Sequence, residues 1–276
     1  MRIPLVTGRV ALAQAPETPA ETLRGLVLDP DDQVAMLVAV HPNLLDSAHD
    51  ALSLHPSCEV RLMDARSERI TERALLLYSL DQSPLVRKAV AESSASTPSV
   101  LIKLISDSNE EVRRAVASSK NVTDAILRYL SNDISPMVRA AVAESPTASG
   151  DVLERLACDE SVVQCAVASN PLTRIDTLFW LIVDGNDDRV VEECINALRV
   201  RPLESWMQLV GEQKINLQSR AGIEDSNMQL GDWLLGKGMT DCYQWIQAAE
   251  LAIKVEQHAV ASQCESTVLS RVRFSL

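Results

Sequence analysis

Aromatic residues are scarce in this chain. Only 3% of its 276 residues are Phe, Trp or Tyr, although 46% are hydrophobic. The interior must therefore consist mostly of Ala, Val and Leu side chains. Such small side chains favour thin, closely stacked helices over a bulky globular core.

Closely spaced cysteine pairs are also missing. The six cysteines are widely scattered and none forms a CxxC motif, a spacing that fits neither a disulfide framework nor a zinc or iron–sulfur signature. We interpret them as small buried thiols in a reducing cytosol and expect a cytoplasmic protein without a cofactor. The cysteines are Cys58, Cys158, Cys165, Cys194, Cys242 and Cys264.

Long apolar runs are absent as well, because no stretch approaches the roughly 20 residues needed to span a bilayer. The mildly apolar segment 1–15 contains Pro4 and Gly8, and we interpret it as a frayed first helix rather than a signal peptide. The net charge of −12 disfavours nucleic acid and anionic membranes, since both attract Lys and Arg.

Motifs of catalysis are not found. The chain has no glycine-rich elbow or P-loop, and no acid pair can be singled out for glycoside chemistry. The metal-ligand candidates are His41, His49, His55 and Cys58, but their spacing fits no familiar zinc pattern. His41 and His55 each precede a proline at a predicted helix end, where a partly charged imidazole would complement the helix dipole. We favour this structural role over a metal site.

What the chain does contain is a repeated segment. Residues 84–93, 110–119 and 136–145 each carry Val-Arg, one further residue and then Ala-Val-Ala. Taking the first Val as an anchor predicts seven units, with steps of 26, 26, 26, 26, 25 and 28 residues. The anchors are Val34, Val60, Val86, Val112, Val138, Val163 and Val191.

Each unit is predicted to hold two helices and no strand. Around the anchor, Val, Ala and Val recur at i, i+3 and i+4 with Ser at i+7 in the three clearest copies, the pattern of one buried helical face. Three residues earlier stands a predicted N-cap, and Pro84 and Pro136 occupy the first helical position. A Leu-rich helix such as 97–105 precedes each anchor. The expected N-caps are Asp31, Ser57, Ser83, Asn109, Ser135, Glu160 and Asp188.

The period stops at Pro202. We therefore predict an N-terminal capping segment (1–17), a repeat array (18–202) and a helical C-terminal cap or small helical domain (203–276). The last part is expected to contain helices at 203–210, 228–235 and 241–263 around a polar loop. In the repeat array, Trp180 is expected to fill the junction where the step widens, with ligand stacking as the alternative.

Units of this pattern, clearest from Thr97-Pro98 to Ser119, resemble the leucine-rich repeat variant family and, more loosely, the short HEAT-like repeats of the bilin-lyase type. The resemblance covers about residues 18–201. It implies an all-α, right-handed solenoid in which the second helix of a pair can be 3₁₀. Founding members of the family carry an iron–sulfur cysteine cluster near the N-terminus. The first cysteine here is Cys58, alone, so that cofactor is not carried over.

Two charged columns run through the repeats. Arginines stand one position after successive anchors, with Lys88 and Arg114 beside them, and aspartates stand four or five positions before the anchors. Either each Arg bridges an Asp or a helix-end carbonyl of a neighbouring unit, or the arginines form an exposed stripe that grips an acidic segment or a phosphate. The columns are Arg61, Arg87, Arg113 and Arg139, and Asp29, Asp81, Asp107, Asp133, Asp159 and Asp187.

These observations favour a non-enzymatic, cytoplasmic binding module, a scaffold or adaptor that docks a partner protein or peptide on the solenoid surface. The expected contact residues are Arg61, Arg87, Lys88, Arg113, Arg114, Arg139 and Glu144, and an acidic segment is the partner feature that the basic residues among them would bind. The alternative is a HEAT-like repeat enzyme, lyase-like or DNA-glycosylase-like, with a pocket on its concave face.

Overall fold

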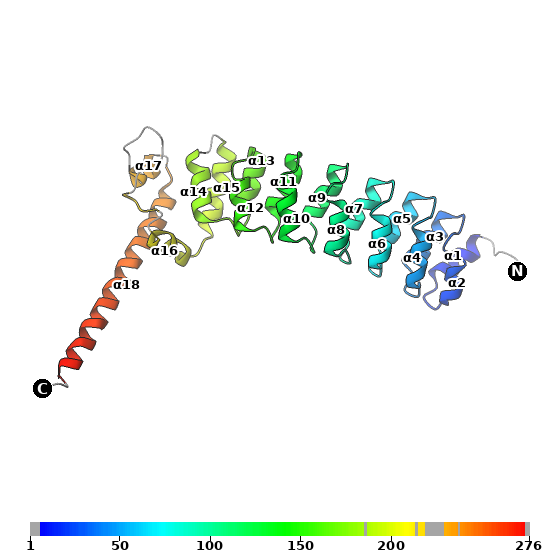
Figure 1. Ribbon diagram of the computed structural model, residues 1–276, viewed down its shortest axis with the longest axis horizontal. Helices are drawn as coiled ribbons and strands as arrows, with labels where there is room; N and C mark the ends of the chain where they lie inside the picture. The colour runs from blue at the N-terminus through cyan, green and yellow to red at the C-terminus, as the bar shows by residue number, and fades with distance from the viewer. Residues whose placement is uncertain (1–5, 185–186, 213–214, 219–228, 237, 274–276) are drawn as a thin grey trace. The chain divides into compact units, whose positions relative to one another are not determined.

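The structure, a computed structural model, describes residues 6–184, 187–212, 215–218, 229–236 and 238–273, with side chains of the last helix as far as residue 259. Within these ranges every regular element is an α-helix and there is no β-strand (Figure 1). The prediction of an all-α repeat solenoid is confirmed. Both helices of the pairs described are α-helical, so the 3₁₀ form that the resemblance allows is not adopted there.

The chain divides into two compact units, Met1–Val152 and Leu153–Leu276. The boundary falls inside helix α12 (Gly150–Leu156). The helices before it are α1 (Val6–Gln14), α2 (Ala20–Arg24), α3 (Asp32–Ala39), α4 (Asp46–Leu52), α5 (Cys58–Ala65), α6 (Glu72–Tyr78), α7 (Pro84–Glu92), α8 (Pro98–Leu104), α9 (Glu110–Ala117), α10 (Asp124–Leu130) and α11 (Pro136–Glu144).

In the first unit the helix pairs follow one another in chain order (Figure 1). The odd-numbered helices from α1 to α11 pack side by side, each on the next, and those from α3 to α11 carry the anchors. The helices between them form the other member of each pair, and α4, α6 and α8 also contact one another in sequence. Helices of seven to nine residues are marginal alone in water, so this stacking holds them. The right-handed sense of the solenoid stays a prediction.

The anchor valines form the core of the array. Every anchor from Val34 to Val163 is fully buried, as the helical spacing predicts. The last predicted anchor is wrong by one residue, because Val190 is fully buried whereas Val191 is partly exposed. The helix there begins after an N-cap at Asp187 rather than Asp188, so the widened step is 27 residues instead of 28.

The second unit continues with α13 (Ser161–Ser169), α14 (Ile175–Asp184), α15 (Asp188–Arg199), α16 (Leu203–Gly211), α17 (Leu230–Gly236) and α18 (Thr240–Arg273). The three C-terminal helices expected from the sequence are found, although most of the loop expected at 211–226 and the first residues of the helix expected at 228–235 lie outside the described residues. The domain boundaries 1–17, 18–202 and 203–276 stay a prediction.

Aromatic packing in the second unit differs from the prediction for Trp180. That side chain is 41% exposed, whereas its neighbour Phe179 is buried and meets Trp206 edge to face, with ring centroids 5.7 Å apart. The ring centroid of Trp206 in turn lies 5.4 Å from that of Trp245. The helix turns Phe179 inward and Trp180 outward, since consecutive residues on a helix point about 100° apart.

Among the described side chains of α18, burial is confined to the N-terminal part of the helix. Cys242, Ile246 and Ala249 are fully buried, whereas Val255 is 60% exposed.

Candidate functional site

The arginine column predicted from the sequence forms a ladder of ion pairs in the first unit. Each arginine directs Nε and Nη2 at the two oxygens of the aspartate twenty residues later, in the next repeat. The Nε–Oδ2 distance is 2.6 Å in all three pairs. These pairs are Arg61–Asp81, Arg87–Asp107 and Arg113–Asp133.

The remaining guanidinium nitrogen holds the turn behind it. Nη1 of Arg87 donates to the carbonyl of Asp81 at 2.7 Å, and Nη1 of Arg113 donates to the carbonyl of Asp107 at 2.6 Å. Arg139 makes the same contact with the carbonyl of Asp133 at 2.7 Å. Arg61, Arg87 and Arg113 therefore each bridge their own turn to the turn of the next repeat, which is the geometry that a planar fork of donors suits.

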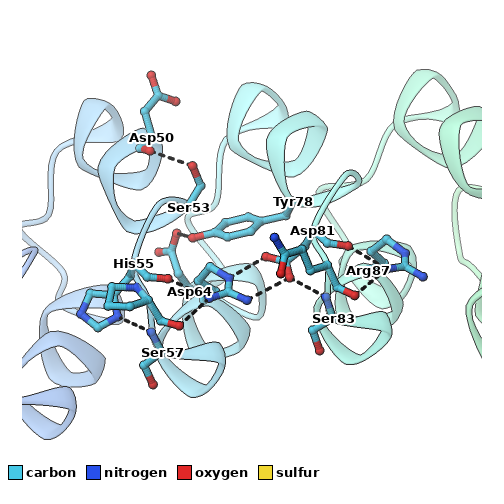
Figure 2. Close-up of polar contacts among 12 residues, drawn as sticks. Asp50, Ser53, His55, Ser57, Asp64, Tyr78, Asp81, Ser83 and Arg87 are labelled. Carbon is cyan, nitrogen blue, oxygen red and sulfur yellow. Dashed lines mark hydrogen bonds and ion pairs between the residues drawn. The ribbon is translucent and has the colours of Figure 1, made fainter.

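The ladder aspartates also begin the anchor helices. Asp81 accepts the backbone N–H of Ser83 at 2.8 Å, and Asp133 accepts that of Ser135 at 2.9 Å (Figure 2 shows Asp81, Ser83 and Arg87). The hydroxyls of these two serines make no capping hydrogen bond, although both residues occupy the predicted N-cap position. The carboxylate two residues earlier satisfies an N–H that would otherwise be orphaned at the helix start.

Electrostatics hold the ladder groups in their charged forms. Burial alone would raise the pKa of Asp107, but hydrogen bonds from Arg87 and from the backbone of Asn109 outweigh it and lower that pKa. The hydrogen bond to Asp107 likewise raises the pKa of Arg87. The Arg87 side chain is only 14% exposed. The geometry thus matches mutual neutralisation between repeats, and a binding role for Arg61, Arg87, Arg113 and Arg139 stays a prediction.

The ladder starts two repeats before Arg61, the first arginine of the predicted column. Arg9 on α1 bonds both oxygens of Asp29, at 2.7 and 3.2 Å. Subtracting one 26-residue period from Val34 leads to Gly8, so an arginine follows the expected anchor position there too. Because Gly8 stands at the anchor position, a search for anchor valines does not find this first repeat.

One rung of the ladder is replaced by a different pair. Ala35 stands at the arginine position of α3, and His55 stands at the aspartate position twenty residues later. The His55 ring makes both the contact that the aspartate makes with the helix start and the contact that the arginine makes with a turn carbonyl. Its Nδ1 accepts the N–H of Ser57 at 3.1 Å (Figure 2). Its Nε2 faces the carbonyl of Asp29 at 3.5 Å, the acceptor that an arginine at position 35 would use.

His41 forms equivalent contacts in the turn that follows α3. Its Nδ1 accepts the N–H of Asn43 at 3.1 Å, and its Nε2 lies 2.9 Å from the carbonyl of Ala15. A backbone N–H can only donate, so Nδ1 is the acceptor in both contacts. The two rings link neighbouring turns, a structural role of the kind predicted for them. The described residues contain no His, Cys, Asp or Glu cluster suited to a metal ion.

The other predicted contact residues lie on the anchor helices. Lys88 bonds Glu111 at 3.1 Å across α7 and α9, and Arg114 bonds the same carboxylate at 3.0 Å. All three side chains are at least 31% exposed. Glu144 is exposed at the end of α11. The two basic residues are therefore accessible but share an acidic partner, and a binding role for these residues also stays a prediction.

A buried polar cluster went unnoticed in the sequence. His49 Nδ1 lies 2.7 Å from Asp64 Oδ1, and the Tyr78 hydroxyl donates to Asp64 Oδ2 at 2.7 Å (Figure 2 shows Asp64 and Tyr78). All three residues are at most 2% exposed. A signal existed, since each departs from the residue that the repeat pattern requires, but departures near the end of an array resemble ordinary divergence.

The outer side of the ladder turns carries exposed leucines. Leu28, Leu54 and Leu80 each precede a ladder position, and they are 60%, 82% and 79% exposed. The ladder residue points inward to its ion pair, and the leucine before it points to solvent. We call these three residues the leucine row. In the next two repeats the same position holds Ser106 and Asn132.

An open hollow of about 450 Å³ follows the leucine row on the same turns. The residues of this hollow are Ile105, Ser106, Asp107, Arg113, Tyr129, Asn132, Asp133 and Ile134. Tyr129 and Ser106 share a hydrogen bond of 2.9 Å, and Ile134 is 91% exposed. Apolar surface thus extends along this edge, although its character changes after Leu80.

No protein-family model matches this chain. No characterised protein in the curated collections matches it either. It is similar to a solved structure described as a leucine-rich repeat variant with a novel repetitive protein structural motif, with 26% identity and a TM-score of 0.56. The match covers 70% of this chain and 77% of the other. With its paired helices and 26-residue period, this chain therefore has a repeat fold of the leucine-rich repeat variant type.

Proposed function

We propose that this protein is a non-enzymatic binding scaffold whose first unit docks a partner protein segment along the leucine row. The observation that carries the proposal is the exposure of a leucine at the same turn position in three successive repeats. Single exposed apolar residues are ordinary, but aligned ones form a continuous strip. Stacked repeats present such strips preformed, which lowers the ordering cost of binding.

The chemistry of the strip favours a segment with apolar side chains and basic flanks. Asp32, Glu59 and Glu110 are exposed in the first turns of anchor helices α3, α5 and α9, directly after the ladder turns. The whole chain carries a net charge of −12. Charge complementarity therefore favours Lys and Arg beside the apolar anchors of the partner.

The distance between neighbouring leucines of the row determines how far apart the apolar side chains of the partner must lie. Packed helices lie about 8–10 Å apart, so neighbouring row leucines are separated by about one such step. An α-helical partner advances about 10.5 Å in seven residues. Apolar side chains at i, i+7 and i+14 of one helix would then face Leu28, Leu54 and Leu80 in turn.

A partner with an acidic segment, gripped by the arginines, is the competing form of the same scaffold function. It is weakened by the ladder geometry, because all three guanidinium nitrogens of Arg61, Arg87 and Arg113 already bond protein acceptors. The enzyme alternative has a similar difficulty. The carboxylates in the hollow, Asp107 and Asp133, are ion-paired and their pKa values are lowered, which does not suit a general acid.

The proposal is tested with three labelled 18-residue helical peptides, measured by fluorescence anisotropy. One carries Leu at i, i+7 and i+14 with Lys flanks, one has these leucines replaced by Ser, and one has Glu flanks. We expect the first peptide to bind, and Leu28→Ser/Leu54→Ser/Leu80→Ser to weaken it at least tenfold. The matched control Leu85→Ser/Ile102→Ser/Met137→Ser removes other exposed apolar residues and should bind as wild type does.

Two results would overturn the leucine row as the docking surface. One is equal affinity of the row variant and the control variant for the first peptide. The other is preferential binding of the Glu-flanked peptide, which would instead support the acidic partner.

A further inference from the structure

At three core positions of the repeat, one helix pair or its neighbour carries a polar residue, and the other pairs from α2 to α11 carry Leu or Val at the same position. His49 stands where Leu23, Leu75, Leu101 and Leu127 are buried; Asp64 stands where Val38, Val90, Val116 and Val142 are buried; and Tyr78 stands where Leu26, Leu52, Leu104 and Leu130 are buried. These are ordinary apolar contacts everywhere else. The three departures are therefore specific to the contact between two neighbouring helix pairs.

The departures meet in a single group. His49 comes from α4, Asp64 from α5 and Tyr78 from α6, so the cluster joins one helix pair to the first helix of the next. Each oxygen of Asp64 has its own partner at 2.7 Å. Burial, together with the Asp64 charge and hydrogen bond, raises the pKa of Tyr78, so its hydroxyl stays protonated and donates.

The chemistry of the cluster makes it selective. Leu and Val positions in the other repeats are nearly interchangeable, so apolar packing alone scarcely distinguishes one helix pair from another, or a pair of this chain from a pair of a second copy. A helix pair that met α5 in any other register would leave the Asp64 carboxylate buried without donors, and an unpaired buried charge is strongly unfavourable. A buried polar group fixes the register of coiled coils by the same logic.

We infer that the His49–Asp64–Tyr78 cluster fixes the order and register in which the helix pairs of the first unit stack, and that it blocks out-of-register exchange of pairs between chains. The cluster is not needed for net stability, because well-packed apolar residues can replace a buried ionic group without loss. Its contribution is selection against wrong neighbours. This inference does not depend on the proposed docking function.

The test is the full-length variant His49→Leu/Asp64→Val/Tyr78→Leu, which installs the residues of the neighbouring repeats. It is unfolded in urea, refolded by dilution at several protein concentrations, and analysed by size-exclusion chromatography with light scattering. We expect a melting temperature equal to or above that of wild type, but refolding into a mixture in which larger, exchanged species increase with concentration. Wild type should return to its starting species at every concentration.

Two further variants complete the test. Leu101→Met/Val116→Ile/Leu130→Met alters the same three positions two repeats later without changing polarity, and should refold as wild type does. Asp64→Val alone strands His49 and Tyr78, and should lower the melting temperature by about 5 °C. Clean refolding of the apolar triple variant would overturn the inference. A melting temperature of that variant below wild type would do so too, because the cluster would then supply stability rather than selection.

Discussion

The contact around α4–α6 and the contacts from α7 to α11 use the same backbone arrangement with opposite chemistry. From α7 onward, Val90, Leu104 and Val116 fill the core positions and are fully buried. Around α5, a carboxylate occupies the equivalent site and is equally buried. The comparison teaches that the repeat tolerates a buried charge where both neighbouring helices change with it, since the cost of burial depends on partners rather than on depth alone.

The largest effect is expected for Val90→Asp, which tests whether a buried carboxylate needs partners that change with it. It places a carboxylate at the position equivalent to Asp64, but the facing residues remain apolar. We expect the free energy of unfolding to fall by about 3–5 kcal/mol, because the charge is buried without donors. Urea denaturation measures this loss.

Glu92→Ala, two residues later on the same helix, is the matched control. Its side chain is 49% exposed, so the variant should stay within about 0.5 kcal/mol of wild type. Equal unfolding free energies for Val90→Asp and Glu92→Ala would show that the buried assignment is wrong.

A second prediction compares the two kinds of ladder rung. Arg87→Ala should lower the free energy of unfolding by about 2–3 kcal/mol, because it leaves the buried Asp107 carboxylate without its fork of donors. Adding Asp107→His rebuilds the Ala35–His55 pair, in which the ring reaches the turn carbonyl from the other side. The double variant should recover about half of the loss, as measured by urea denaturation.

Asp107→His alone is the control for this cycle, because it places an imidazole against Arg87 instead of beside an alanine. Recovery requires the two changes together. If the double variant is less stable than Arg87→Ala, the Ala35–His55 pair is not an equivalent rung and reflects divergence of an early repeat.

The smallest expected effect is on the pH dependence of stability. The pKa values of Asp107 and Asp133 are lowered on folding, chiefly because hydrogen bonds from Arg87 and Arg113 outweigh burial. Their contribution is fully present above the unfolded pKa of about 4 and is lost as the pH falls through the lower folded value. Unfolding free energy should therefore decline below about pH 5, and less steeply in Arg113→Ala. Parallel acid profiles for the two proteins would contradict this.

The accessible surface remains the part least governed by the repeat pattern. None of the described helices combines the length and apolar character that crossing a bilayer requires. The leucine row and the hollow near Tyr129 were not predicted, because a repeated leucine at a helix end does not by itself show whether its side chain is buried or exposed. The Trp180 prediction failed for a related reason. The sequence shows that two large aromatic side chains stand next to each other, but the orientation of the helix places Phe179 inside and Trp180 outside.

The sequence by itself determined the period, the two helices of each unit and the buried anchors, because burying one face of a short helix requires a strict spacing that remains visible in a single chain. It also put arginine and aspartate in columns. Only the tertiary structure decided that the columns neutralise each other, that His55 replaces an entire rung, and that His49, Asp64 and Tyr78 meet. Those outcomes depend on which side chains face one another across repeats, and the energy of a charge is set by its neighbours in space.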